Sequence, residues 1–184
     1  MSSSASSPTT SSTCRVPSLV VFDLDFTVWF PEMYELAGAP FRRCKKSGRV
    51  MDRAGEIIHV FPDFPKIWKD IHTKYPNMKI AVASSTTHPK WAQRCLELLP
   101  MDPIANTLHE GIEYREMYPR NKRNHFREIQ KESGIPYEEM LFFDNEYYNI
   151  DSVSPLGVTS IYCPEGMTWR HWEDGIRAFQ EKED

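Results

Sequence analysis

The 184-residue sequence predicts a single α/β domain: a three-layer, Rossmann-like parallel β-sheet with helices on both faces and a small cap or none. Two observations predict this class. From residue 18 onward, short apolar runs alternate with segments of helical periodicity, and strands buried on both faces of a parallel sheet have this continuous apolar character. The chain is also long enough for one substantial core and too short for two.

Apolar runs predict the strands of this sheet. The clearest runs cover residues 18–23, 79–85, 138–145 and 157–163. A further strand is expected within residues 104–114. Separately, the Gly-bounded, β-prone residues 48–63 predict a hairpin or two short strands.

Amphipathic periodicity predicts four helices between or after these strands. They cover residues 63–76, 88–100, 121–133 and 167 to about 181. Local signals support their ends: Asp63 is a candidate N-cap, Pro89 lies near a first turn, and Gly134 follows a last turn. No internal repeat interrupts this alternation of strands and helices.

Residues 1–17 differ from the rest of the chain. Ten of the first thirteen residues are Ser or Thr, and no acidic residue precedes Asp23. Such a segment cannot bury apolar surface, so it predicts a flexible tail ahead of a domain at residues 18–184. An acid-poor, Ser-rich start also fits a transit peptide, although Arg15 is its only basic residue.

Charge and cysteine content exclude several classes of protein. The net charge of −4, from 22 basic and 26 acidic side chains, gives no reason to expect nucleic-acid binding. No apolar stretch approaches the roughly 18 residues that a membrane helix needs, so we expect a soluble, cytoplasmic protein unless the tail directs it to an organelle. The cysteines form no C-x-x-C pair, which favours isolated reduced thiols. They are Cys14, Cys44, Cys95 and Cys163.

Polar residues end three of the predicted strands. They are Asp23 and Asp25, Ser84 and Ser85, and Asp144 and Asn145. Ligands of open α/β sheets bind beyond the carboxyl ends of the strands, where these side chains would meet. Two carboxylates can bind a hard cation, attack an electrophile or exchange protons, while hydroxyl and ammonium groups hold an anion. The pattern therefore indicates a phosphate held against Mg²⁺.

Four motifs in order carry a resemblance to phosphatases of the haloacid dehalogenase superfamily. "DLDFT" (23–27) matches the D-x-D-x-T signature, and Ser84 in "IAVASS" corresponds to the Ser or Thr that ends the next core strand. Lys122 in "YPRNKRNHF" and the Asp144–Asn145 pair in "LFFDNE" match the third and fourth motifs. The resemblance spans roughly residues 18–165 and is greatest to the eukaryotic magnesium-dependent phosphatases.

The resemblance implies a Mg²⁺-dependent phosphomonoester hydrolase with a role for each motif. Asp23 would be the nucleophile, forming an aspartyl-phosphate, and Asp25 the general acid and base. Asp23, the backbone carbonyl of Asp25, and Asn145 or Asp144 would bind Mg²⁺, with Asn145 favoured as the direct ligand. The phosphate-binding group would comprise Ser84, Lys122, Thr27 and Ser85, with Thr27 steadying the loop.

The same resemblance implies an open site and suggests substrates. About 60 residues separate Asp23 from Ser84, which suits a small β-flap at about residues 30–62 rather than a separate lid. Similar phosphatases act on phosphotyrosine and on small sugar phosphates, so we expect a phosphorylated small molecule or a phosphoprotein as substrate, possible tyrosine phosphatase activity, and a monomer. Neither nucleic acid nor membrane is expected as a partner.

The sequence departs from the family pattern at three places. Asn145 replaces the second acid of many relatives, which removes one negative charge from the metal site. Ser85 stands where close relatives place Arg, which removes a bidentate phosphate partner. Tyr147 and Tyr148 replace more polar residues. These departures keep open an alternative, a phosphate-binding or phospho-accepting signalling module without turnover.

Structural roles also compete with the catalytic ones. Ser84 and the Asp144–Asn145 pair could cap the helices that follow them, and Lys122 lies in a basic run that would usually be a solvated helix face. Trp29 is expected to pack in the flap or core, with stacking on a substrate as the alternative. His125, one turn beyond Lys122, is expected to be structural.

Overall fold

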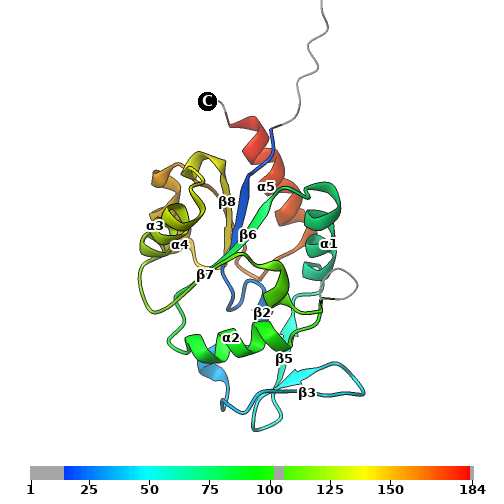
Figure 1. Cartoon of the computed structure of the whole chain (residues 1–184). Helices are drawn as coiled ribbons and strands as arrows, with labels where there is room; N and C mark the ends of the chain where they lie inside the picture. The colour runs from blue at the N-terminus through cyan, green and yellow to red at the C-terminus, as the bar shows by residue number, and fades with distance from the viewer. Residues whose placement is uncertain (1–14, 102–105, 183–184) are drawn as a thin grey trace, which may run out of the picture.

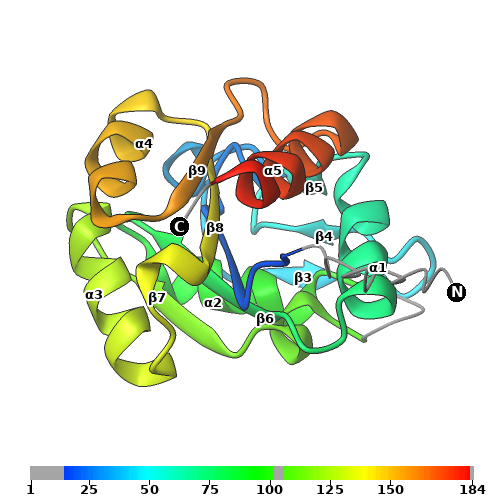
Figure 2. The same ribbon diagram turned by 90° about the horizontal axis from the view of Figure 1, so that it is seen from above.

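The computed structural model describes residues 15–101 and 106–182 and contains the parallel sheet that the sequence predicts. Five parallel strands occur in the order β7-β6-β1-β8-β9. Their bounds are β1 Leu19–Phe22, β6 Lys79–Ser84, β7 Tyr114–Met117, β8 Met140–Asp144 and β9 Thr159–Tyr162. In Figures 1 and 2 this sheet lies between two groups of helices, which confirms the three-layer α/β class.

Alternating side chains of the strands build one core on each face of the sheet. In β1, Leu19 and Val21 join the cluster beneath α3 (Lys122–Ser133) and α4 (Tyr147–Val153). Val20 and Phe22 point the other way, into a larger cluster. That cluster packs beneath α1 (Phe64–Lys74), α2 (Pro89–Leu98) and α5 (Trp169–Glu181). All these strand residues are almost fully buried, which explains the continuous apolar runs in the sequence.

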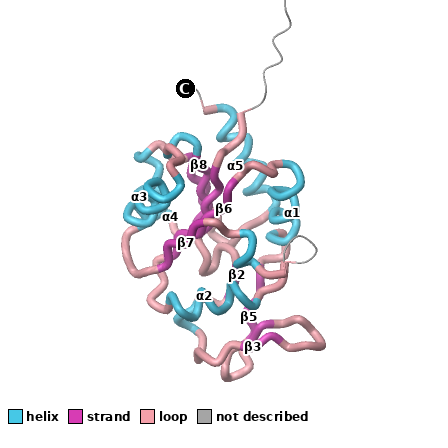
Figure 3. Tube along the Cα trace, in the orientation of Figure 1, coloured by secondary structure: helices cyan, strands magenta, loops and turns pink. Residues whose placement is uncertain are grey.

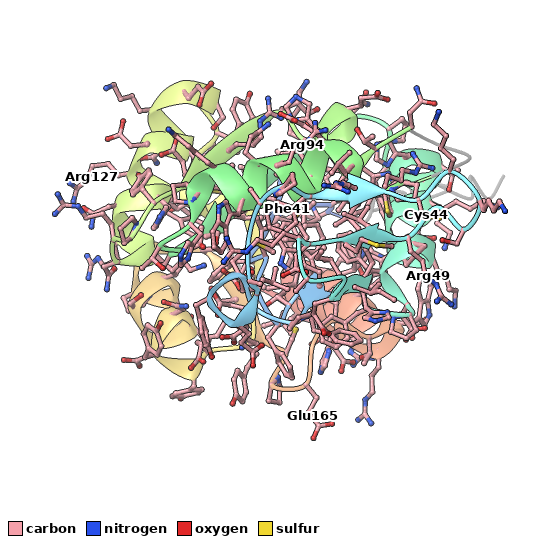
Figure 4. All side chains as sticks on the ribbon, turned by 90° about the horizontal axis from the view of Figure 1, so that it is seen from below. Phe41, Cys44, Arg49, Arg94, Arg127 and Glu165 are labelled. Carbon is pink, nitrogen blue, oxygen red and sulfur yellow. The ribbon has the colours of Figure 1, made fainter. Side chains whose placement is uncertain are left out.

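A second, antiparallel sheet lies below the carboxyl ends of the main strands (Figures 1 and 3). Its four strands occur in the order β2-β5-β4-β3. Their bounds are β2 Trp29–Phe30, β3 Arg42–Arg43, β4 Val50–Met51 and β5 Ile57–Val60. Pairing of β4 with β5 confirms the hairpin expected within residues 48–63. In Figure 4, Cys44 and Arg49 mark the β3–β4 end of this sheet, far from Arg127 on α3.

Short 3-10 helices connect several elements. They are η1 Met33–Glu35, η2 Leu108–Gly111, η3 Tyr137–Glu139 and η4 Ser154–Leu156. The position of η2 corrects the strand expected within residues 104–114, because β7 begins only at Tyr114. Leu108 and Ile112 are buried in the core from this turn region, so their apolar character reflects packing of a connection. Residues 102–105 lie outside the described residues.

The N-cap position predicted for Asp63 is confirmed, but its side chain has a different partner from the one that capping requires. Asp63 occupies the N-cap position of α1, but its side chain forms no capping hydrogen bond there. Its Oδ2 instead accepts a hydrogen bond of 2.8 Å from the backbone N–H of Trp169, in the first turn of α5. Tertiary packing of α1 against α5 therefore redirects this carboxylate to the neighbouring helix. Gly134 does end α3, with the left-handed φ of 71° that glycine adopts without strain.

Several sequence-based expectations concern the termini, cysteines and membrane spans. Residues 1–14 of the predicted tail, including Cys14, lie outside the described residues. Arg15 forms an ion pair of 3.0 Å with Glu139. Cys44, Cys95 and Cys163 are free thiols. Within the described ranges, no helix is both long and apolar enough to cross a membrane.

Candidate active site

The carboxyl ends of β1, β6 and β8 meet at a cavity of about 350 Å³. Register explains the convergence, because Phe22 lies opposite Val82 on one side and Phe143 on the other. The residues that follow these strands therefore lie side by side. Six of the sequence-predicted residues line the cavity: Asp23, Asp25, Ser84, Ser85, Lys122 and Asn145. Thr27 and Asp144, the other two, are fully buried beneath it.

A tight turn after β1 places Asp23 and Asp25 on one side of the chain and Leu24 on the other. The N–H groups of Thr27, Val28 and Trp29 bond to the carbonyl of Leu24, whose side chain is buried in the core. The turn requires a left-handed φ of 55° at Phe26, an uncommon conformation for a residue with a Cβ atom. The Phe26 side chain is directed outward and is exposed.

Lys122 is buried at the centre of the site, so it is not part of a solvated helix face. Its Nζ donates hydrogen bonds to Asp23 Oδ1 and to the carbonyl of Ala83, and lies 3.2 Å from Asp144 Oδ2. These three acceptors match the three donors of an ammonium group. Burial alone would lower the pKa of Lys122, but the adjacent Asp23 and Asp144 carboxylates outweigh it and raise the pKa. The two carboxylates therefore favour the charged form of Lys122.

Burial also perturbs the two carboxylates of the turn. It raises the pKa of Asp23 to about 7, against the opposing effect of Lys122. It raises the pKa of Asp25 to about 6, although hydrogen bonds from Trp29 and from the backbone of Met33 favour the charged form. Perturbed acids beside a cavity are typical of functional sites.

Asp144 and Asn145 occupy different environments despite being neighbours. Asp144 is enclosed: Asn149 Nδ2 donates to both of its oxygens at 3.0 and 3.1 Å, and the Glu146 N–H donates to Oδ1 at 2.8 Å. Asn145 lines the cavity. Its Oδ1 lies 3.3 Å from Thr27 Oγ1, which is 3.2 Å from Asp23 Oδ2. The Thr27 hydroxyl thus keeps oxygens of Asp23 and Asn145 close together at one wall.

The donor set and charge of this wall suit a divalent cation. Three carboxylates, Asp23, Asp25 and Asp144, surround one buried ammonium, so ionisation of all three leaves an excess of two negative charges. The described residues contain no group of three or more His, Cys, Asp or Glu side chains arranged to hold a metal alone. Mg²⁺ does not need such a group, because it takes one or two carboxylates and keeps several waters or phosphate oxygens.

The two serines after β6 differ in their hydrogen bonds. Ser84 Oγ accepts from the Thr86 N–H at 3.3 Å and forms no cap on α2, whose N-cap is His88. This leaves the Ser84 hydroxyl hydrogen free of any acceptor within the described part of the chain. Ser85 Oγ donates to the carbonyl of Arg120 at 2.9 Å, so its hydroxyl hydrogen is already engaged.

Residues outside the sequence motifs complete the site. Trp29 is fully buried and its Nε1 donates to Asp25 Oδ1 at 2.7 Å, which makes it a partner of Asp25 rather than a stacking surface. Asn149 holds Asp144 in place, and Glu32, Tyr34, Thr86, Thr87, Glu146 and Tyr148 line the cavity. His125 is structural, because its ring stacks on Tyr118 and its Nε2 lies 3.0 Å from the carbonyl of that residue. The sequence did not indicate that Trp29 bonds to Asp25 or Asn149 to Asp144, although each pair is only four or five residues apart.

Comparison with known proteins relates this geometry to phosphatases. A family model described as Acid Phosphatase matches residues 15–182. The human protein Magnesium-dependent phosphatase 1 is 35% identical over 165 residues, covering 90% of this chain and 88% of its own length. A HAD-like hydrolase superfamily protein of Schizosaccharomyces pombe is 39% identical over 147 residues, covering 78% of this chain and 83% of its own.

A solved structure supports the fold. The N-terminal part of a Bacteroides fragilis protein, which contains a phosphatase domain in complex with Mg, superposes with a TM-score of 0.58 at 19% identity. The match covers 89% of this chain but only 39% of that one. At this identity the likeness shows a shared fold alone.

Proposed function

Since the chain belongs to the acid phosphatase family within the haloacid dehalogenase superfamily, near its magnesium-dependent phosphatases, we propose that its cavity hydrolyses phosphate monoesters through an aspartyl-phosphate on Asp23. The observation that carries this proposal is the buried arrangement of Asp23, Lys122 and Asp144 at the ends of adjacent strands. A structural ion pair would not require a cavity above it, whereas a phosphoryl-transfer site needs both access and fixed charges.

The proposed reaction has two steps with Asp23 as nucleophile. In the first, a carboxylate oxygen of Asp23 attacks phosphorus, and the substrate alcohol leaves after accepting a proton from Asp25. In the second, Asp25 removes a proton from water, whose oxygen attacks the phosphorus of the aspartyl-phosphate. This step releases inorganic phosphate and restores the Asp23 carboxylate. Both side chains line the cavity, as the two steps require.

Mg²⁺ is the expected cofactor, and the human relative is named a magnesium-dependent phosphatase. Asp23, the backbone carbonyl of Asp25 and Asn145 would hold it, since oxygens of Asp23 and Asn145 already share the Thr27 hydroxyl. Asp144, whose oxygens bond to Asn149, Glu146 and Lys122, would support the site from behind. When bound, Mg²⁺ supplies positive charge that offsets the charge of the phosphate oxygens.

Phosphate oxygens would be held opposite the metal. Lys122 contributes charge from beneath the cavity, and Ser84 has a hydroxyl hydrogen with no acceptor in the described ranges. Ser85 would take part only after releasing the carbonyl of Arg120. The second sheet would act as a small flap beside this open site, so phosphotyrosine-type groups and small sugar phosphates are both proposed as substrates.

Removal of the metal tests the proposed function directly. Release of phosphate from an aryl phosphate should proceed with Mg²⁺ and fall by about 100-fold or more when EDTA removes it, because the excess negative charge of the site then faces the phosphate. Excess Mg²⁺ should restore the rate. Equal rates with Mg²⁺ and EDTA would contradict the metal assignment, and no turnover by a folded protein would favour a binding-only module.

Replacement of Trp29 with Phe should change the pKa of Asp25 while leaving the Asp25 carboxyl group in place. The variant loses the 2.7 Å hydrogen bond that favours the Asp25 carboxylate, so the pKa of Asp25 should rise. We expect kcat to fall by about tenfold, and the limb of the kcat/KM pH profile that reports Asp25 to move to higher pH. Steady-state kinetics across pH would measure both.

The matched control is Trp68→Phe. Trp68 is as buried as Trp29, but its indole N–H has no partner within the described ranges. This variant should lose stability and leave the pH profile in place. If both variants shifted the profile equally, the Trp29 hydrogen bond would have no specific effect on Asp25.

A further inference from the structure

Exposed aromatic side chains gather at the mouth of the cavity. Of the six large apolar side chains that are exposed in the described ranges, all but Val16 lie in this region: Phe26, Tyr34, Tyr147, Tyr148 and Tyr162. Tyr34 and Tyr148 line the catalytic cavity itself. Exposed apolar side chains that cluster at one opening indicate a ligand surface more strongly than scattered ones.

A second cavity of about 430 Å³ continues from the first. Four residues line both cavities: Glu32, Tyr34, Asn145 and Glu146. Because Asn145 belongs to the proposed metal site and lines both cavities, a phosphate held there lies next to this second space. The volume accommodates a side chain or a small organic group.

The walls of the second cavity are aromatic and negatively charged. Phe26, Tyr34 and Tyr162 supply rings. Glu32, Glu35 and Glu146 supply carboxylates, and none of the described Lys or Arg residues lines this cavity. The described residues place none of these glutamates in an ion pair. Aromatic faces beside unpaired carboxylates attract cations through both ring quadrupoles and charge.

This wall is held in shape before any ligand arrives. A hydrogen bond between the Tyr34 hydroxyl and Glu32 raises the pKa of Tyr34 to about 12. The Glu32 N–H donates to Glu35 Oε2 at 2.9 Å. Tyr162 packs edge-on against Tyr147, with ring centroids 5.6 Å apart. These contacts lower the entropic cost of ordering the wall around a ligand.

A buried acceptor without a partner lies in the catalytic cavity, although it does not line the second one. Asn149 lines it and is only 3% exposed. Its Nδ2 faces both oxygens of Asp144, which fixes the amide orientation, and its Oδ1 has no hydrogen-bond partner in the described residues. An unpaired buried acceptor is satisfied by an N–H or O–H donor. Among the described residues, Lys122 is the only cation that lines the catalytic cavity, and its three donors are already taken.

We propose that the second cavity is a subsite for a cationic group, an ammonium or guanidinium, carried by the alcohol portion of the phosphorylated substrate. The proposal rests on the proposed phosphatase function and specifies its substrate. The cation comes either from a small phosphorylated amine or from a Lys or Arg next to a phosphorylated residue.

Two pairs of substrates test the subsite and separate these sources. The small pair is phosphoethanolamine and propyl phosphate, which differ in one ammonium group. The peptide pair contains phosphotyrosine followed by Lys or by norleucine. We expect kcat/KM to be about tenfold higher for the cationic member of at least one pair, and the preference to shrink at high salt. Whichever pair shows it identifies the source.

Two variants assign the preference to the second cavity. Glu35→Gln removes a charge and keeps an acceptor for the Glu32 N–H, whereas Tyr162→Ser removes a ring without changing charge. Neither residue belongs to the proposed catalytic group, so both variants should keep the wild-type rate on the uncharged substrates and lose most of the preference. Glu173→Gln, an exposed glutamate on α5, is the matched control and should keep it.

The outcomes separate the two proposals. If the wild type hydrolysed the cationic and the uncharged substrate of each pair with equal kcat/KM, the subsite would be overturned and the phosphatase function would stand. A preference unchanged in Glu35→Gln and Tyr162→Ser would also overturn it, by assigning the effect to the general field of the protein. Failure to hydrolyse any of the four substrates or an aryl phosphate would overturn the phosphatase function, and the subsite with it.

Discussion

Replacing Asp23 with Asn should reduce kcat/KM for an aryl phosphate by about 10⁴-fold or more, because an amide cannot take the place of the carboxylate nucleophile. Asn has nearly the same shape as Asp. Its carbonyl oxygen can still accept a hydrogen bond from Lys122 or Thr27, the two side chains that donate to Asp23. The loss should therefore be one of chemistry rather than of folding. Steady-state phosphate release and urea denaturation would measure the two separately.

Two further measurements make this prediction specific. Asp151→Asn alters an exposed carboxylate on α4 and should leave the rate unchanged. Asp25→Asn retains the nucleophile but lacks the base for the second step. With an aryl phosphate, whose leaving group needs little protonation, mass spectrometry should therefore detect one phosphoryl group on Asp23 after brief exposure. Retention of more than about 1% of the wild-type rate by Asp23→Asn would contradict the aspartyl-phosphate route.

Replacing Lys122 with Met should impair both stability and activity. Met is close in size, but it leaves Asp23 and Asp144 facing each other without the ammonium that bonds to Asp23 and lies 3.2 Å from Asp144. Removing one partner of a buried ion pair typically costs 3–5 kcal/mol, so we expect the free energy of unfolding to fall by about 3 kcal/mol. Loss of the charge beneath the phosphate should lower kcat/KM by about 10³-fold.

The control for this prediction is Lys79→Met. Lys79 is half exposed and its Nζ lies 3.7 Å from Glu113, a surface pair whose loss should change stability by less than about 1 kcal/mol. Urea denaturation in EDTA compares the two variants without metal. A Lys122→Met protein as stable as wild type would mean that Asp23 and Asp144 do not depend on this ammonium.

Much of the fold follows from local sequence. Apolar runs such as residues 18–23 and 138–145 locate β1 and β8 because strands buried on both faces allow few other residues. Helical spacing and Gly134 locate α3 and its end. The strand within 104–114 was misplaced because the apolar residues of a buried connection, Leu108 and Ile112, resemble those of a strand. Hydrophobic periodicity indicates which residues are buried, but it does not always show whether they belong to a strand, a helix or a connection.

The candidate site was predicted only where its residues follow strands. Asp23, Ser84 and Asn145 come directly after apolar runs, so parallel-sheet geometry alone brings them to one edge. Glu32, Tyr34 and Tyr148 line the same cavity, yet none of them ends one of the strands predicted for the parallel sheet. Their position depends on how η1 and α4 pack beside β1 and β8, which no local pattern records.

The sequence by itself determined the α/β class, the positions of most strands along the chain and the chemical groups at their ends, because strand burial and hydrophobic period are local properties. Only the tertiary structure decided how charged and polar groups are paired. It buried Lys122 between Asp23 and Asp144, enclosed Asp144 while leaving Asn145 at the cavity, and directed Trp29 to Asp25. Lys122 and Asp23 are 99 residues apart and meet only when the chain has folded. Pairs that are close in sequence, such as Trp29 and Asp25, form because burial leaves their polar groups no water to bond.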